Sequence, residues 1–146
     1  MNLLLELVAT LSASLFTGAS IYINLVEHPA RMSCGTPLAV TEFAPSYKRA
    51  TIMQVALAVI SFLSSLIAWL THSSVYWLVG GILIVIVIPF TVIVILPTNK
   101  KLLDTSLDKN SEYARQLLNQ WGRLHAVRSV LSFISLLIFL YALTWR

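Results

Sequence analysis

Three side chains near the C-terminus have the types and spacing for acid–base chemistry. Trp121, His125 and Arg128 stand four and three residues apart, which places them on one stripe of a helix. An imidazole can take up a proton near neutral pH, and a guanidinium can stabilise an oxyanion. The pattern therefore indicates proton abstraction, with His125 as the catalytic base and Arg128 as the cation that holds the substrate's anion.

Glu27 is the acidic residue best placed to partner this stripe. It lies at the end of the first apolar run, four residues before Arg31. A carboxylate and a guanidinium that face a bundle interior are tolerated when they are paired. We therefore predict that Glu27, His125 and Arg128 form one hydrogen-bonded cluster, in which Glu27 orients one of the other two groups. Arg31 is the alternative positive partner of Glu27.

A second chemistry would use the same region. His28, His125 and Glu27 supply two imidazoles and one carboxylate, which is the ligand inventory of non-haem iron sites that activate oxygen. Two helices must bring these groups together, and Pro29 can turn His28 away. The cofactor therefore stays open between none, iron and haem. Lone Cys34 offers no Cys-x-x-C pair, which argues against thiol redox chemistry.

The composition is that of a membrane protein. Of 146 residues, 58% are hydrophobic and 11% are charged, and the mean hydropathy is +0.82, far outside the range of soluble domains. About 20 helical residues cross a hydrocarbon core of about 30 Å, and apolar runs of that length occur four times. We predict an all-α fold, an integral membrane four-helix bundle. It is a single domain over residues 1–146, whose last helix extends into the cytosol, with helices at about 3–26, 49–71, 76–96 and 111–145.

Basic residues are concentrated in two of the three connections. The chain has 10 Lys and Arg against 6 Asp and Glu, and in a membrane protein this excess indicates cytoplasmic loops rather than nucleic-acid binding. Both basic loops are therefore predicted to be cytoplasmic and both termini outside, in a bacterial-type inner or plasma membrane. The basic residues of these loops are Arg31, Lys48, Arg49, Lys100, Lys101, Lys109, Arg115 and Arg123.

Prolines and turn residues set the expected helix ends. Pro29 disfavours helix at the preceding residue, so the first helix is expected to end or kink at His28. Residues 32–46 contain Cys-Gly-Thr-Pro and Ala-Pro-Ser, which predict a loop, whereas residues 102–120 are predicted to form an exposed helical segment. Pro89 is expected to kink the third helix.

The polar ends of the predicted helices converge on the cytoplasmic side. We expect them to enclose a pocket, in which Trp121 and Tyr47 offer flat surfaces for an aromatic ligand. The alternative is that these side chains only anchor the bundle at the interface, as His, Arg and Trp commonly do. Ser61 and Ser65 are expected to join helices, and His72 is expected at the far side. The residues predicted to bind the substrate are Trp121, Tyr47, Asn24, Gln54 and Asn99.

Four segments at these helix ends resemble those of a known family. They are Ile-Asn-Leu-Val-Glu-His-Pro-Ala-Arg (23–31), Pro-Ser-Tyr-Lys-Arg-Ala-Thr (45–51), Ile-Leu-Pro-Thr-Asn-Lys (95–100) and Trp-Gly-Arg-Leu-His-Ala-Val-Arg-Ser (121–129). In order and spacing they are similar to the anthrone oxygenase-like family, small four-helix membrane proteins long catalogued as a domain of unknown function. The resemblance implies the fold and the pocket, and an oxidation of polyketide anthrones to anthraquinones by molecular oxygen without an established cofactor. The positions that match the family are Glu27, Pro29, Asn99, Trp121, His125 and Arg128.

Two functions follow from the residues and the resemblance. The first is a membrane-embedded oxygenase that oxidises a hydrophobic aromatic or quinone-like small molecule at an acidic C–H beside a carbonyl or phenol. Such an oxidation needs only a base and a cation, because the enolate reacts with oxygen directly. The second is a non-catalytic membrane protein that binds a lipid, quinone, haem or metal at the same pocket. Both predict a hydrophobic small molecule and membrane lipid as partners and no nucleic acid, and both leave a homo-oligomer open.

Overall fold

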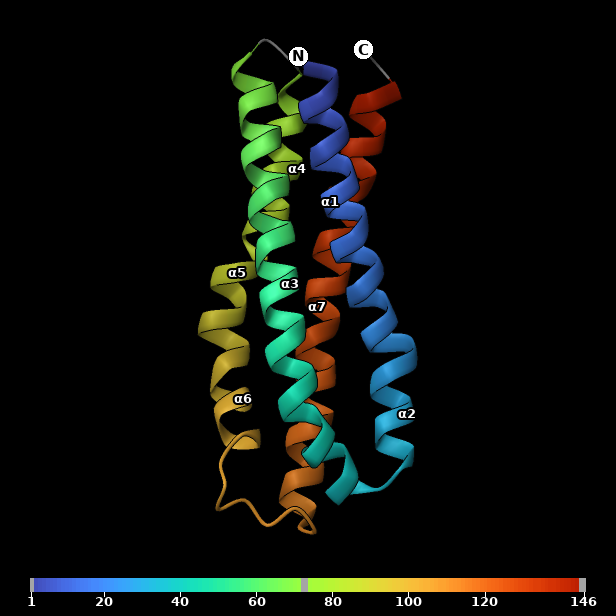
Figure 1. The fold of residues 1–146 in the computed structure, drawn as a ribbon, viewed down its shortest axis with the longest axis vertical. Coiled ribbons are helices and arrows are strands. Elements are labelled where there is room, and N and C mark those ends of the chain that lie inside the picture. Colours follow the sequence, from blue (N-terminus) through green and yellow to red (C-terminus); the bar gives the residue numbers. More distant parts are fainter. Residues whose placement is uncertain (1, 72–73, 145–146) are drawn as a thin grey trace.

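Four long helical columns make up the computed structural model, which describes residues 2–71 and 74–144 (Figure 1). Two of the columns are interrupted by short π-helical turns, named η1 and η2. In chain order the columns are α1 (Asn2–Tyr22), η1 (Ile23–Glu27) and α2 (His28–Ser33); then α3 (Thr36–Leu70); then α4 (Val75–Val85), α5 (Val87–Phe90), η2 (Thr91–Ile95) and α6 (Leu96–Leu102); and last α7 (Glu112–Thr144).

Each column is long and apolar enough to cross a membrane, which confirms the predicted all-α, integral membrane bundle. In the upper half α1 packs on α3 and α7, and α4 packs on the same two helices. The described ends of the first and last columns lie at the same end of the bundle as the end of α3 and the start of α4 (Figure 1). The opposite end carries the α2–α3 and α6–α7 connections and the polar site described below.

Two of the helices are longer than a bilayer requires. At about 1.5 Å per residue, the 35 residues of α3 span about 50 Å, against a hydrocarbon core of about 30 Å. We take the hydrocarbon core to begin at Leu70 on α3 and at Thr144 on α7, at the end of the bundle where the first and last columns have their described termini, and count about 20 residues from there. The far boundary of the hydrocarbon then falls near Thr51 and Leu124. Beyond that level both helices extend out of the hydrocarbon core.

The segment predicted as a loop at residues 32–46 is mostly helical, because α3 begins at Thr36. The preceding Gly35 has φ +89°, a backbone conformation that favours glycine, and it lets the chain reverse before the helix. Val40 and Phe43 are buried in one cluster with Trp121 and with Leu118 of α7. This burial favours helix over the turn chemistry of the local sequence.

The prediction that residues 102–120 are helical is wrong for residues 103–111. The chain leaves the helix after Leu102 and re-enters it at Glu112. Asp104 accepts hydrogen bonds from the backbone N–H of Ser106 (2.8 Å) and from its hydroxyl (2.7 Å). Aspartate and serine side chains that bind nearby backbone donors compete with helix formation, so this connection is a series of turns.

The first column was predicted to end or kink at His28; it does not end there but continues through Pro29 to Ser33. The π-helical turn η1 ends two residues before this proline, and η2 ends two residues before Pro97 in the same way. A proline leaves the carbonyl four residues earlier without its donor, and a wider turn re-spaces the backbone there. The third column is interrupted at Ile86, three residues before Pro89, where a kink was predicted.

Hydroxyl groups join the helices in the apolar half of the bundle. Ser61 of α3 donates to the carbonyl of Ala9 on α1 (2.8 Å), which confirms its predicted part in helix packing. Ser65 instead donates within its own helix, to the carbonyl of Phe62 (2.9 Å). The predicted far-side position of His72 falls outside the described residues.

Candidate active site

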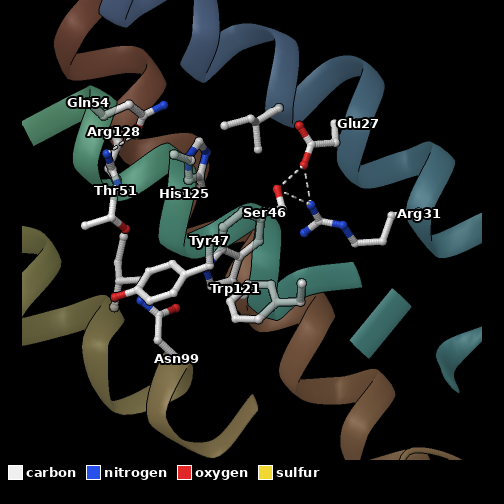
Figure 2. A pocket seen from close by; sticks show the side chains of 14 residues that line it. Glu27, Arg31, Ser46, Tyr47, Thr51, Gln54, Asn99, Trp121, His125 and Arg128 are labelled. Carbon is white, nitrogen blue, oxygen red and sulfur yellow. Dashed lines mark hydrogen bonds and ion pairs between the residues drawn. The ribbon is translucent and has the colours of Figure 1, made fainter. Parts of the chain in front are cut away.

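A pocket lies where η1 and α2, the first half of α3, α6 and α7 meet (Figure 2). Its cavity volume is about 20 Å³, enough for about one water-sized molecule. Most of the residues that the sequence singled out face this cavity: Glu27, Tyr47, Gln54, Asn99, Trp121, His125 and Arg128. The structure therefore brings the candidate base, the candidate cation and the aromatic rings together, while their chemical roles stay predictions.

His125 is held by Asn24 across the bundle. The Asn24 amide nitrogen donates to the backbone carbonyl of Gly122 (3.1 Å), which can only accept, so the amide oxygen must face the other way. That oxygen lies 2.8 Å from His125 Nδ1 and accepts from the Ser129 hydroxyl at 2.5 Å. Because an amide oxygen cannot donate, His125 Nδ1 must carry a proton when this bond forms.

This arrangement fixes the chemistry of the other ring nitrogen. A neutral imidazole protonated at Nδ1 has its lone pair on Nε2, and within the described residues His125 makes no hydrogen bond through Nε2. The His125 side chain is buried, and its ring lines the cavity while stacking on Trp121 at 4.8 Å between ring centroids. Nε2 of His125 can therefore accept a proton, and the role of catalytic base stays a prediction. Asn24 was predicted to bind substrate. It lines neither this cavity nor the second cavity described below, and its side chain is hydrogen-bonded to His125 instead.

Glu27 does not join His125 and Arg128 in one hydrogen-bonded cluster, contrary to the prediction. Its carboxylate accepts from Arg31, one helical turn on, and from the Ser46 hydroxyl at 2.7 Å. Arg31 is also ion-paired with Glu42 of α3. The reason is that the column continues through the proline, which keeps Arg31 within reach of Glu27 on the same helix. Figure 2 shows Glu27, Arg31 and Ser46 on the opposite side of the pocket from Arg128.

Arg128 is the unusual charge of the site. Its Nη2 donates to the Gln54 side-chain oxygen at 2.5 Å, and its guanidinium carbon lies 5.6 Å from the centre of the Phe16 ring. In the described part of the chain no carboxylate lies within ion-pair distance of it. A cation at this depth is costly unless it faces a wet cavity or a partner, so the site is suited to receive an anion.

Buried amide groups point to the same conclusion. Asn99 is 1% exposed, and neither its side-chain oxygen nor its nitrogen has a hydrogen-bond partner among the described residues. The same is true of Gln54 Nε2 and Arg128 Nε. Buried polar atoms are nearly always satisfied, and all three side chains line the pocket. They supply donors and acceptors for a polar group that enters it.

Most of this site lies in the part of the chain that matches a known protein family. The sequence model of a family described as anthrone oxygenase matches residues 43–138. The chain belongs to the anthrone oxygenase family. The match contains every site residue on α3, α6 and α7, whereas Asn24, Glu27 and His28 precede it. No curated protein and no solved structure matches the chain.

The iron set predicted from His28, His125 and Glu27 is not assembled in this family member. His28 packs against the Trp121 ring, 5.2 Å between centroids, and Glu27 is paired with Arg31. Within the described residues no three His, Cys, Asp or Glu side chains are grouped so that they could hold a metal ion. The three side chains therefore do not form an iron site, and the cavity is far smaller than the several hundred Å³ typical of sites for a large cofactor, so it does not fit a haem.

Other parts of the pocket were not anticipated from the sequence. Phe16, which lies under Arg128 outside the pocket lining, comes from a segment without a distinctive pattern, and Ser46, which bonds Glu27, lies in the family-like segment 45–51 but was given no role. Trp121 was predicted to stack on a ligand. In the structure its ring already contacts His125, with Arg31 5.7 Å from its centroid. Its predicted contact with substrate therefore stays a prediction.

Proposed function

We propose that this protein is a membrane oxygenase that oxidises a hydrophobic aromatic or quinone-like molecule at an acidic C–H beside a carbonyl or phenol. The observation that carries the proposal is that a candidate base and a cation without a carboxylate partner lie one helical turn apart on α7. His125 has Nδ1 committed to Asn24, and Arg128 has no carboxylate partner in the described chain. Membership of the anthrone oxygenase family supports an oxygenase-type reaction.

The first step is proton transfer from the substrate carbon to His125 Nε2. The electron pair of the broken C–H bond moves to the substrate oxygen, which becomes an enolate or phenolate. Arg128 stabilises this negative charge, and the unpartnered amides of Gln54 and Asn99 offer further donors. Because these dipoles are already in place, they need little reorganisation when the charge develops.

Molecular oxygen is the second reactant, and it supplies the oxidising power. The carbanion carbon bonds to one oxygen atom, and the terminal oxygen receives a proton from the imidazolium to give a hydroperoxide. Loss of the second proton from that carbon cleaves the O–O bond and releases water. The balance is R₂CH₂ + O₂ → R₂C=O + H₂O, in which the carbon loses four electrons and dioxygen gains four.

The pocket is proposed to lie at the cytoplasmic boundary of the membrane, because the basic residues of the connections are at this end. Cys34 is exposed between α2 and α3 at the same end. We expect a membrane-impermeant thiol reagent to leave Cys34 unmodified in intact cells and to modify it in inverted vesicles. Labelling from outside intact cells would place the pocket on the opposite face.

The activity is tested by oxygen consumption with anthrone as the model substrate and purified protein in detergent. We expect the wild type to consume oxygen and release anthraquinone, and His125→Gln to lose this activity while still binding anthraquinone. Arg115→Gln, on the exposed face of α7, is the matched control and should retain it. If the wild type binds the ligand but oxidises no faster than His125→Gln, the protein is a binding protein and the oxygenase proposal fails.

A further inference from the structure

A second cavity lies beside the pocket, on the other side of Gln54 and Arg128. Its volume is about 110 Å³, and its walls come from α1, α3, α5, η2, the start of α6 and α7. We call it the lateral groove. Its lining is mainly apolar and includes Phe16, Val55, Val87, Ile88 and Val92. Val55 and Val92 are 41% and 56% exposed, so the groove opens sideways between α3 and η2.

The groove and the pocket share one wall. Tyr47, Thr51, Gln54 and Arg128 line both cavities. Gln54 is 2% exposed, yet its Nε2 has no hydrogen-bond partner among the described residues. A buried, unsatisfied donor at the inner end of an apolar groove indicates that an acceptor arrives there with a ligand.

The volumes decide which cavity receives the body of the ligand. The pocket beside His125 holds about 20 Å³, enough for one water-sized molecule and far too little for an aromatic ring. The groove holds about 110 Å³, which approaches the roughly 150 Å³ of an engineered cavity that binds benzene. One ring of a fused aromatic molecule can therefore enter the groove, with the other rings in its mouth.

The level of the groove in the membrane fixes the direction of entry. The hydrocarbon boundary falls near Thr51 and Leu124, and the groove runs from there into the hydrocarbon, past Val55 one turn deeper. Exposed valines at that depth face acyl chains rather than water. The mouth of the groove is therefore a lateral opening to the bilayer, and its inner end is the polar wall of the pocket.

We propose that the lateral groove binds the ring system of a flat, fused-ring phenol or ketone. The molecule enters sideways from the bilayer, with its oxygen-bearing edge toward Gln54 and Arg128. This inference rests on the proposed function for the reaction that follows, in which the reacting edge of the molecule reaches past Gln54 and Arg128, the wall shared by both cavities, to His125. It identifies Val55 and Val92 as the residues that admit the substrate.

The test narrows the groove with tryptophan and compares matched positions. Val55→Trp and Val92→Trp place an indole in the mouth of the groove. Val59→Trp and Val94→Trp are controls on the same two segments, because both valines are exposed, at 37% and 39%, and line neither cavity. All four proteins are purified in detergent with the wild type.

The first readout is equilibrium binding of anthraquinone, which cannot be oxidised further, and the second is KM for anthrone in oxygen consumption. We expect the two groove variants to bind anthraquinone at least about tenfold more weakly, because a ring loses its buried surface, and to show a similar rise in KM. The two control variants should remain within about twofold of the wild type.

The outcomes separate this inference from the proposed function. Oxidation by the wild type with unchanged KM and affinity in both groove variants overturns the groove and leaves the oxygenase. Saturable binding that is lost only in the groove variants, without oxidation by the wild type, supports the groove and overturns the oxygenase. Absence of saturable binding by the wild type, or equal losses in groove and control variants, also overturns the groove.

Discussion

The substitution Asn24→Leu tests whether the base is positioned by a single amide. Leucine has nearly the same shape as asparagine but removes both polar atoms. It deletes the acceptor for His125 Nδ1 (2.8 Å) and for Ser129 (2.5 Å), and the donor to the Gly122 carbonyl (3.1 Å). Asn24 lines neither cavity, so the contacts of the substrate are left in place.

The expected magnitudes follow from these bonds. Three neutral hydrogen bonds in a membrane bundle, at about 0.6–1 kcal/mol each, give a loss of about 2–3 kcal/mol in the free energy of unfolding. Without the amide oxygen, the proton of His125 is no longer confined to Nδ1 and the ring is no longer oriented. A misplaced general base costs roughly 100-fold or more in kcat, whereas KM should change little.

The assay is steady-state oxygen consumption with anthrone, together with denaturant unfolding in detergent. Asn24→Asp is the rescue variant, because a carboxylate still accepts from His125 and Ser129, and it should recover most of the lost kcat. Ser14→Ala controls for the helix, since it removes only a hydrogen bond to the carbonyl of Thr10 within α1. Wild-type kcat in Asn24→Leu, or equal losses in the leucine and aspartate variants, would refute the assigned tautomer.

Three further predictions concern the rest of the bundle. A methyl group at Gly122 would lie 2.6 Å from Nε2 of His28, whereas a methyl group at Gly18 would meet nothing within 4 Å. Gly122→Ala should therefore lower Tm, and Gly18→Ala should not. Arg128→Met should keep or raise Tm, because the buried cation lacks a carboxylate partner in the described chain, yet it should abolish anthrone oxidation, while Arg115→Met changes neither. Hydrogen bonds from the backbone N–H and the hydroxyl of Ser106 lower the pKa of Asp104. The turn that these bonds form is therefore stable at pH values above the ordinary aspartate pKa, and it is lost as the pH falls through the lowered pKa. Amide hydrogen-exchange protection in the α6–α7 connection, taken relative to the intrinsic exchange rate at each pH, should fall only in that acid range.

The sequence by itself determined the class of fold and the composition of the site. Apolar runs long enough to cross a bilayer require helices, because backbone groups in lipid must be satisfied within the chain. The last helix, predicted at 111–145, is observed over Glu112–Thr144. Polar side chains at the helix ends had to gather at one end of an antiparallel bundle, and Trp121, His125 and Arg128 had to share a face of α7. These features depend only on hydropathy and on the helical repeat.

The partners within the site were decided by the tertiary structure. Whether Glu27 pairs with Arg31 or with Arg128 depends on whether the helix continues past Pro29. It does continue, with a π-helical turn just before the proline. Residues 36–46 are helical because their apolar side chains cover the extension of α7, a contact that no local pattern contains. The Asn24 side chain faces His125 rather than the cavity because the backbone of Gly122 fixes its amide. The Glu27–Arg31 pair depends on a helix that continues through Pro29, whereas the last two choices are made by atoms far apart in the sequence, whose distances are set only when the helices pack.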